Sequence, residues 1–225
     1  MPPHVARVSA EDSRLQLIEA LARTMHAREA ATYEHAERVR AYALALAETV
    51  PACDAHTIDA LDHAALLHDI GKLAIPDWLL HKPGPLAADE YDHVKQHVTI
   101  GADMLAAIAY PGPLALIVRH HHEHWDGSGY PDGLAGDAIP VGARILAVAD
   151  FYDALTSDRP YRRAFAHDRA IAMLQDRAGR GYQPEIVQLF VTLVERLKAQ
   201  PNRIVAPRFP DLVRAGWLID ARTAG

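Results

Sequence analysis

The sequence predicts an all-α protein folded as one helical domain, and three observations support this. Alanine and leucine dominate the 225 residues, apolar residues recur at helical spacing, and the alternating β-branched runs typical of strands are nearly absent. A chain of this length can bury one large core. We expect an N-terminal segment over residues 1–14, the helical domain over residues 15–200, and a Pro- and Arg-rich extension over residues 201–225.

The first three predicted helices each have an apolar face, and two of them carry a histidine on it. The apolar stripe on residues 15–23 consists of Leu15, Ile18, Leu21 and Ala22. It suits packing either in the core or against a second copy of the chain in a homodimer. His35 begins a helix over residues 35–50 and lies on its apolar face. The next helix carries His68 inward, and Gly71 is expected to end it.

The second half of the domain brings further polar side chains inward. A Pro- and Gly-rich connection over residues 75–85 is expected to run over the surface beside the site. One predicted helix carries His97, another spans residues 113–122, and turn residues mark a loop over residues 126–133. Asp150 lies on the apolar face of a later helix, where a carboxylate is costly without a cation.

Charge and composition exclude several functions. The net charge is -6, with 23 basic residues against 29 acidic ones, and no basic block is present, which argues against nucleic-acid binding. The single Cys53 cannot form an internal disulfide, and the N-terminus lacks the apolar core of a secretory signal. The most apolar stretch, residues 104–118, is broken by prolines and too short to cross a bilayer. We expect a cytoplasmic protein with no membrane span.

Five histidines and two aspartates are the candidate metal ligands. They are His35, His68, Asp69, His97, His121, His122 and Asp150. Imidazole nitrogens and carboxylate oxygens bind divalent first-row metals, and seven such side chains suffice for two ions. The alternative for any single histidine is a hydrogen-bonded core residue. Taken together, the seven predict a dinuclear metallohydrolase.

Two motifs resemble a known family. Residues 68–72, His-Asp-Ile-Gly-Lys, resemble the signature of the HD superfamily of metal-dependent phosphohydrolases. Residues 121–131, HHEHWDGSGYP, are similar to the extended signature of the HD-GYP subfamily, which degrades the bacterial messenger cyclic di-GMP. The resemblance covers about residues 15–200 and implies an HD-domain helical bundle with an HD-GYP extension.

The resemblance also implies the roles of the site residues. One metal would be held by His35, His68, Asp69 and Asp150. The second would be held by His97, His121 and His122, with Asp69 bridging the two. Such a pair of ions permits a bridging hydroxide to attack phosphorus. The resemblance implies iron first and manganese second. Ala31 stands where members with a third metal have glutamate, so two metals are expected.

Further residues match substrate-handling positions of the family. Lys72 would act at the scissile phosphate beside Asp69, and Arg159 and Arg162 would grip substrate phosphates. For these two arginines the alternative is pairing with nearby aspartates. Tyr130 would pack against the nucleotide or hold the loop. Outside this set, Glu123 is expected to brace a histidine, and His120 and His124 are interpreted as a solvated helix end rather than as support for ligands.

These observations predict a phosphodiesterase that opens cyclic di-GMP to linear pGpG, with further hydrolysis to GMP left open. One alternative is a phosphohydrolase that acts on another nucleotide. Another is a catalytically silent cyclic di-GMP receptor or docking module. A diguanylate cyclase or a separate sensor or receiver protein would be the partner that supplies regulation.

Overall fold

The computed structural model describes residues 9–28, 30–158 and 162–199, and within these ranges it is helical, with isolated β-bridges and no strand. The all-α expectation is therefore confirmed. The helices in chain order are α1 (Ala10–Arg28), α2 (Ala30–Ala47), α3 (Ala55–Leu67), the 3-10 helix η1 (Ile70–Ala74), α4 (Asp77–Leu80), α5 (Ala88–Lys95), α6 (His97–Ala106), α7 (Leu114–His120), the 3-10 helix η2 (Gly136–Ala138), α8 (Val141–Thr156), α9 (His167–Asp176) and α10 (Pro184–Lys198).

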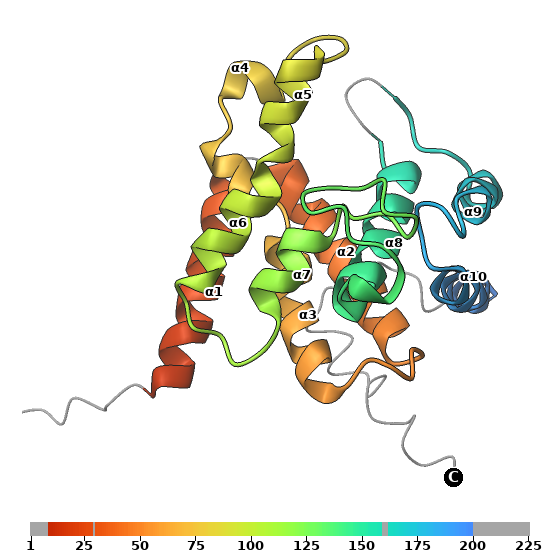
Figure 1. The fold of residues 1–225 in the computed structure, drawn as a ribbon, viewed down its shortest axis with the longest axis horizontal. Coiled ribbons are helices and arrows are strands. Elements are labelled where there is room, and N and C mark those ends of the chain that lie inside the picture. The colour runs from red at the N-terminus through yellow and green to blue at the C-terminus, as the bar shows by residue number, and fades with distance from the viewer. Residues whose placement is uncertain (1–8, 29, 159–161, 200–225) are drawn as a thin grey trace, which may run out of the picture.

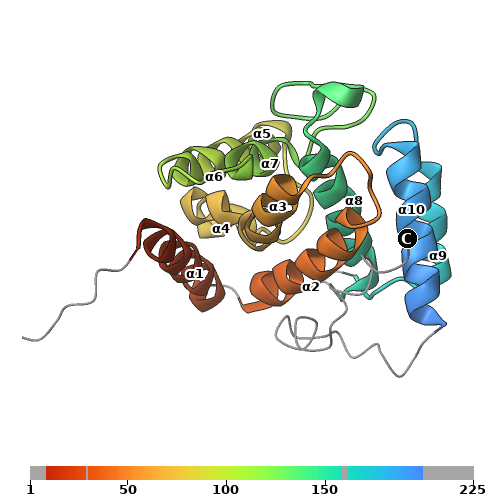
Figure 2. The ribbon, with the colours of Figure 1, turned by 90° about the horizontal axis from the view of Figure 1, so that it is seen from below.

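The central helices α2, α3, α7 and α8 pack on one another, and the remaining helices surround them. Helix α1 and the α9–α10 pair cover opposite sides of this centre (Figure 1, Figure 2). Helix α1 buries Ile18, Ala22 and Met25, whereas Leu15 is 43% exposed. Part of the predicted stripe therefore joins the core. The boundaries at residues 14 and 200 stay a prediction, and residues 201–225 lie outside the described part of the chain.

The junction between α3 and η1 differs from the expectation. Helix α3 begins with Asp54, whose carboxylate accepts the backbone N–H of Thr57 at 2.8 Å. It ends at Leu67, so the expectation that Gly71 ends this helix was wrong. Gly71 instead lies inside η1 against α6, where an added Cβ would be 1.9 Å from the carbonyl oxygen of His97. This glycine therefore allows a backbone contact that no side chain would permit.

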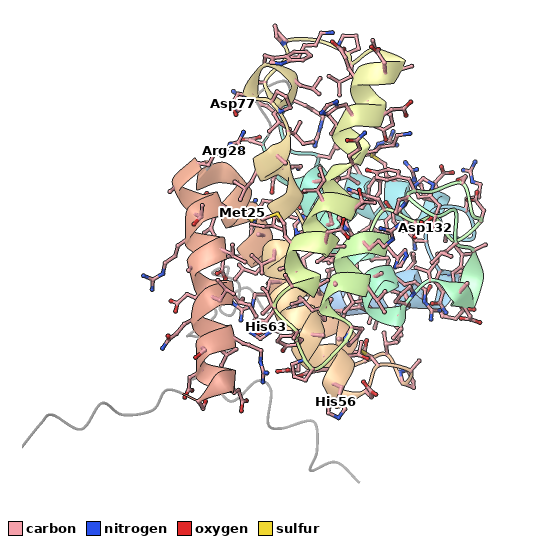
Figure 3. The ribbon with its side chains drawn as sticks, turned by 60° about the vertical axis from the view of Figure 1, so that its left-hand side comes forward. Met25, Arg28, His56, His63, Asp77 and Asp132 are labelled. Carbon is pink, nitrogen blue, oxygen red and sulfur yellow. The ribbon has the colours of Figure 1, made fainter. Side chains whose placement is uncertain are left out.

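The region after η1 is more helical than expected. The Pro- and Gly-rich connection contains the one-turn helix α4, and the helix predicted to carry His97 is divided into α5 and α6, with Gln96 between them. His97 is thus the first residue of α6. Arg28, at the end of α1, donates to the carbonyl oxygens of Leu73 and Ile75 and pairs with Asp77 of α4 (Figure 3). These bonds fix the segment that follows Lys72.

None of the helices formed by the described residues combines the length and the hydropathy that are needed to cross a membrane.

Candidate metal centre

The first candidate group joins three helices. His35 comes from α2, His68 follows the last residue of α3, and Asp150 lies on α8. One potential ligand atom from each residue lies within 4.8 Å of the others. Both histidines are buried, with His35 8% and His68 1% exposed. Helix faces that the sequence predicted to be apolar therefore carry these side chains to one point.

The second candidate group comprises His97, His121 and His122, and one potential ligand atom from each lies within 4.8 Å of the others. His97 opens α6, and the other two directly follow α7. The rings of His121 and His122 lie 4.0 Å apart between centroids, and the rings of His68 and His121 lie 5.3 Å apart. The two groups are therefore neighbours in one cluster of imidazoles.

Asp69 lies between the two groups. Its Oδ2 atom is 3.4 Å from Nε2 of His68, and its Oδ1 atom is 3.5 Å from Nε2 of His97. The residue is 5% exposed. One oxygen of this carboxylate thus faces each group, because η1 begins directly after Asp69 and packs against α6 through Gly71.

Hydrogen bonds fix the ring nitrogens. The Nδ1 atoms of His68, His97 and His121 lie 2.8, 2.9 and 2.7 Å from the backbone carbonyl oxygen three residues earlier. A carbonyl oxygen only accepts, so Nδ1 carries the proton and Nε2 has a free lone pair in the neutral ring. The helix ends therefore select the tautomer that leaves Nε2 available as a ligand.

Two of these Nε2 atoms, those of His97 and His121, are buried and have no hydrogen-bond partner among the described residues. Buried polar atoms without partners are rare and costly. Burial lowers the pKa of His97, and it lowers the pKa of His121 well below its ordinary value. Burial likewise lowers the pKa of His122 to about 4. Neutral imidazoles beside carboxylates are the donor set that divalent first-row metals take, so the residues present fit two such ions.

Reasoning from the sequence missed the residue that orients His35. Nδ1 of His35 donates to Asp153 at 2.6 Å, and Nε2 lies 3.0 Å from Asp150. Arg38 also donates to Asp153, at 2.7 Å. Burial would lower the pKa of His35, but the hydrogen bonds and charges of the two aspartates outweigh it and raise this pKa to about 9. The available signal was spacing, since Asp153 lies three residues after Asp150 and one helical turn brings both to one face.

Lys72 lies beside the central carboxylate. Its Nζ atom is 2.6 Å from Oδ2 of Asp69, and its side chain is 33% exposed. Burial of Asp69 would raise its pKa, but the positive charges of Lys72 and His68 outweigh this and keep the pKa well below its ordinary value. Lys72 is thus a cation at the border between the buried cluster and solvent.

The loop after α7 covers the second group. The ring of Tyr130 lies 5.0 Å from that of His122 between centroids. Glu123 is 3% exposed, and its carboxylate accepts the backbone N–H groups of Asp132 at 2.7 Å and Leu134 at 3.1 Å. The expectation that Glu123 braces a histidine was therefore wrong, because it braces this loop.

The interpretation of His120 as part of a solvated helix end was also wrong. His120 is 7% exposed, and its Nε2 atom lies 2.9 Å from Asp132. Arg119 forms two further hydrogen bonds with the same carboxylate, both at 2.8 Å. His124 is half-buried and contacts Ser128 at 2.9 Å. Two residues at the end of α7 thus hold the loop through Asp132.

The two predicted phosphate-binding arginines have different outcomes. Arg159 lies outside the described residues. The guanidinium group of Arg162 donates to the carbonyl oxygens of Ala154 at 2.5 Å and Leu155 at 3.2 Å, and it lies 4.4 Å from the ring centroid of Phe165. It therefore caps the end of α8, and within the described part of the chain it pairs with no aspartate. Its role toward substrate stays a prediction.

The chain is similar in sequence to known proteins. The HD-domain family matches residues 19–186. The cyclic di-GMP phosphodiesterase response regulator RpfG of Xanthomonas campestris is 42% identical over 179 residues, which cover 79% of this chain and 47% of RpfG. The 3'3'-cGAMP-specific phosphodiesterase 2 of Vibrio cholerae is 37% identical over 186 residues, covering 82% of this chain and 35% of that protein.

A solved structure agrees at the level of the fold. The HD domain of Listeria monocytogenes phosphodiesterase PgpH, in complex with cyclic di-AMP, matches with a TM-score of 0.58 and 17% identity, over 80% of this chain and 96% of that one. The chain spans about half the length, or less, of the curated relatives described above. The chain belongs to the HD-domain family, within its HD-GYP group.

Proposed function

We propose that the chain is a metal-dependent phosphodiesterase that hydrolyses cyclic di-GMP to linear pGpG at a dinuclear centre. The observation that carries this proposal is the position of Asp69, with one oxygen 3.4 Å from His68 and the other 3.5 Å from His97. A carboxylate shared in this way suits two ions held side by side. RpfG, at 42% identity, is a cyclic di-GMP phosphodiesterase by name, which supports the substrate.

The protein's own residues would hold and orient the reacting groups. His35, His68 and Asp150 would hold one ion, and His97, His121 and His122 the other, with iron expected first and manganese second. When bound, the two ions supply Lewis-acid charge at the phosphate and help to activate water. The backbone carbonyls that fix the Nδ1 protons keep the Nε2 atoms directed at this point, so little reorganisation is needed during the reaction.

Lys72 would complete the centre. Its ammonium group lies 2.6 Å from Asp69 and is part-exposed, so it can approach a phosphate oxygen bound beside that carboxylate. A cation there stabilises negative charge that grows on the phosphate in the transition state. Tyr130, 5.0 Å from His122 between ring centroids, would form a wall against the nucleotide.

The test is anaerobic purification of the chain, elemental analysis, and incubation with cyclic di-GMP, with products identified by chromatography. Asp69→Ala should abolish turnover and lower the metal content. His56→Ala is the control, since His56 is exposed, belongs to neither candidate metal group, and lies at the opposite end of the view from Asp77 (Figure 3). Full activity of Asp69→Ala would overturn the proposal.

A second substrate needs a parallel assay, because one relative at 37% identity is named as 3'3'-cGAMP-specific. Turnover of 3'3'-cGAMP at a kcat/KM above that of cyclic di-GMP would reassign the substrate and retain the reaction. Tight binding of cyclic di-GMP without hydrolysis under iron, manganese, zinc and nickel would instead identify a receptor.

A further inference from the structure

A groove of about 850 Å³ lies outside the candidate metal centre, between the loop after α7 and helix α9. Its lining includes His124 and Ser128 from that loop, Phe151 from α8, and three arginines on and after α9, namely Arg169, Arg177 and Arg180. No residue of either candidate metal group lines it. Its volume falls in the range of small-molecule sites.

Cations line this groove in a chain whose net charge is -6. Arg180 lies 3.6 Å from Asp176, and both side chains are at least 70% exposed, so this pair is weak. Arg169 and Arg177 have no carboxylate within ion-pair distance among the residues that the structure describes. Two guanidinium groups therefore remain available to an anion.

The carboxylates that line the groove do not cancel this charge. Asp126 is engaged locally, because its Oδ1 atom accepts the backbone N–H of Ser128 at 2.9 Å. Asp176 is the exposed partner of Arg180. The groove therefore contains three cations and two carboxylates, and one of these carboxylates is already hydrogen-bonded to backbone.

The walls are tied together by backbone hydrogen bonds. The N–H of Trp125 donates to the carbonyl oxygen of Gly181 at 3.2 Å, and the N–H of Asp126 donates to that of Arg180 at 2.9 Å. Among the lining residues, Phe151 is part-buried, and the guanidinium group of Arg177 lies 5.3 Å from its ring centroid. The groove thus combines a fixed frame, an aromatic side chain and guanidinium groups.

We propose that this groove binds a small phosphorylated ligand of nucleoside monophosphate size. The phosphate contacts Arg169 and Arg177, and the body of the ligand packs against Phe151 and Met173. Guanidinium groups match phosphate oxygens through paired N–H donors, and apolar lining side chains favour a ligand with a flat organic part. This site is separate from the proposed catalytic centre and does not depend on its chemistry.

The test is calorimetric titration of the metal-loaded full chain with GMP, inorganic phosphate and guanosine as probes. The variants are Arg169→Gln, Arg177→Gln and the pair combined. Arg196→Gln is the matched control, because Arg196 is an exposed arginine of α10 that does not line the groove. We expect the double variant to weaken GMP binding in the groove about tenfold or more, and the control to leave it unchanged.

The two proposals have distinguishable failures. If the catalytic proposal alone is wrong, a GMP site sensitive to Arg169 and Arg177 remains. If GMP binding responds to Lys72→Ala and not to the arginine variants, the ligand lies in the catalytic centre and the groove proposal is overturned. Failure of GMP to bind at millimolar concentration, or guanosine binding as tightly as GMP, overturns it as well.

Discussion

Asp153 accepts a hydrogen bond from Nδ1 of His35 at 2.6 Å, across 118 positions of sequence. Arg38, one turn after His35 on α2, donates to the other oxygen of the same carboxylate at 2.7 Å. The side chain of Asp153 is 2% exposed. The buried hydrogen bond between His35 and Asp153 joins α2 to α8. It also turns Nε2 of His35 toward the carboxylate of Asp150, which lies 3.0 Å away.

Removal of Asp153 should weaken metal binding without touching a ligand. Asp153→Ala deletes the acceptor that orients His35, and loss of such a partner typically lowers metal affinity 10- to 100-fold. Asp153→Asn keeps an acceptor oxygen and should lose less. Competition with a chelator measures the affinity. Asp103→Ala, which removes an exposed carboxylate of α6, is the control. Equal metal affinity in Asp153→Ala and the control would contradict the assigned role.

The contact between η1 and α6 gives a second prediction. A Cβ at position 71 would lie 1.9 Å from the carbonyl oxygen of His97 and 2.7 Å from the backbone nitrogen of Gly101. Because both atoms are backbone, Gly71→Ala must separate η1 from α6 and move Asp69 away from His97. We expect a loss of about 1–3 kcal/mol in the free energy of unfolding, measured by urea denaturation, together with reduced metal content.

Gly84→Ala is the control for this substitution. An added Cβ at Gly84 meets no atom within 4 Å, and its φ of +109° leaves backbone strain as the only cost. A stability loss at position 71 no larger than that at position 84, with metal content retained, would show that the contact does not position Asp69.

The sequence predicted helix faces better than it predicted helix ends. Helical spacing placed His35 and Asp150 on apolar faces, and the structure brings them to one group because α2 and α8 pack together. The division at Gln96 and the end of α3 at Leu67 were not predictable in this way. Close to both, Gly71 of η1 contacts the backbone of α6, and this contact joins residues distant in sequence, whereas periodicity describes only neighbours.

The supporting residues were harder to predict than the candidate ligands. The family resemblance implied roles for the seven candidate ligands. Helical spacing put Asp153 only on the same face as Asp150, and its hydrogen bond to His35 forms because α2 lies beside α8. Glu123 shows the same limit. It was expected to brace a histidine, yet its carboxylate accepts the backbone N–H groups of Asp132 and Leu134. Hydrogen-bond partners of this kind are set by tertiary packing.

Glu123 should hold the loop that carries Tyr130. Glu123→Ala leaves the N–H groups of Asp132 and Leu134 without their acceptor, which costs about 1–3 kcal/mol for each group that stays buried. We expect faster amide hydrogen exchange and faster proteolysis within residues 126–133. Glu185→Ala, at an exposed position in the first turn of α10, is the control. Unchanged exchange in the loop would exclude this bracing role.

The single cysteine should be unreactive in the folded chain. Burial, followed by the charge of Asp54, raises the pKa of Cys53 from 9.0 to about 11. The thiolate is the reactive form, so at pH 8 the folded protein should hold about 100-fold less of it than the unfolded chain. Iodoacetamide labelling followed by mass spectrometry, with and without urea, measures this ratio. Labelling of the folded protein should rise as pH approaches 11, and equal rates at pH 8 would contradict the shift.

Tyr91 should help to position Tyr130 from the neighbouring helix. Nζ of Lys95 lies 5.2 Å from the ring centroid of Tyr91 and 5.8 Å from that of Tyr130, so one cation joins α5 to the loop. Tyr91 is 49% exposed, and its loss should leave the fold intact. If the chain is the proposed phosphodiesterase, Tyr91→Ala should raise KM for cyclic di-GMP about two- to fivefold with little change in kcat.

Trp78→Ala, which removes a 65% exposed aromatic side chain of α4, is the control. Equal KM values for the two variants would show that Tyr91 does not act on the loop, and a large fall in kcat for Tyr91→Ala would place it closer to the chemistry than the contacts indicate.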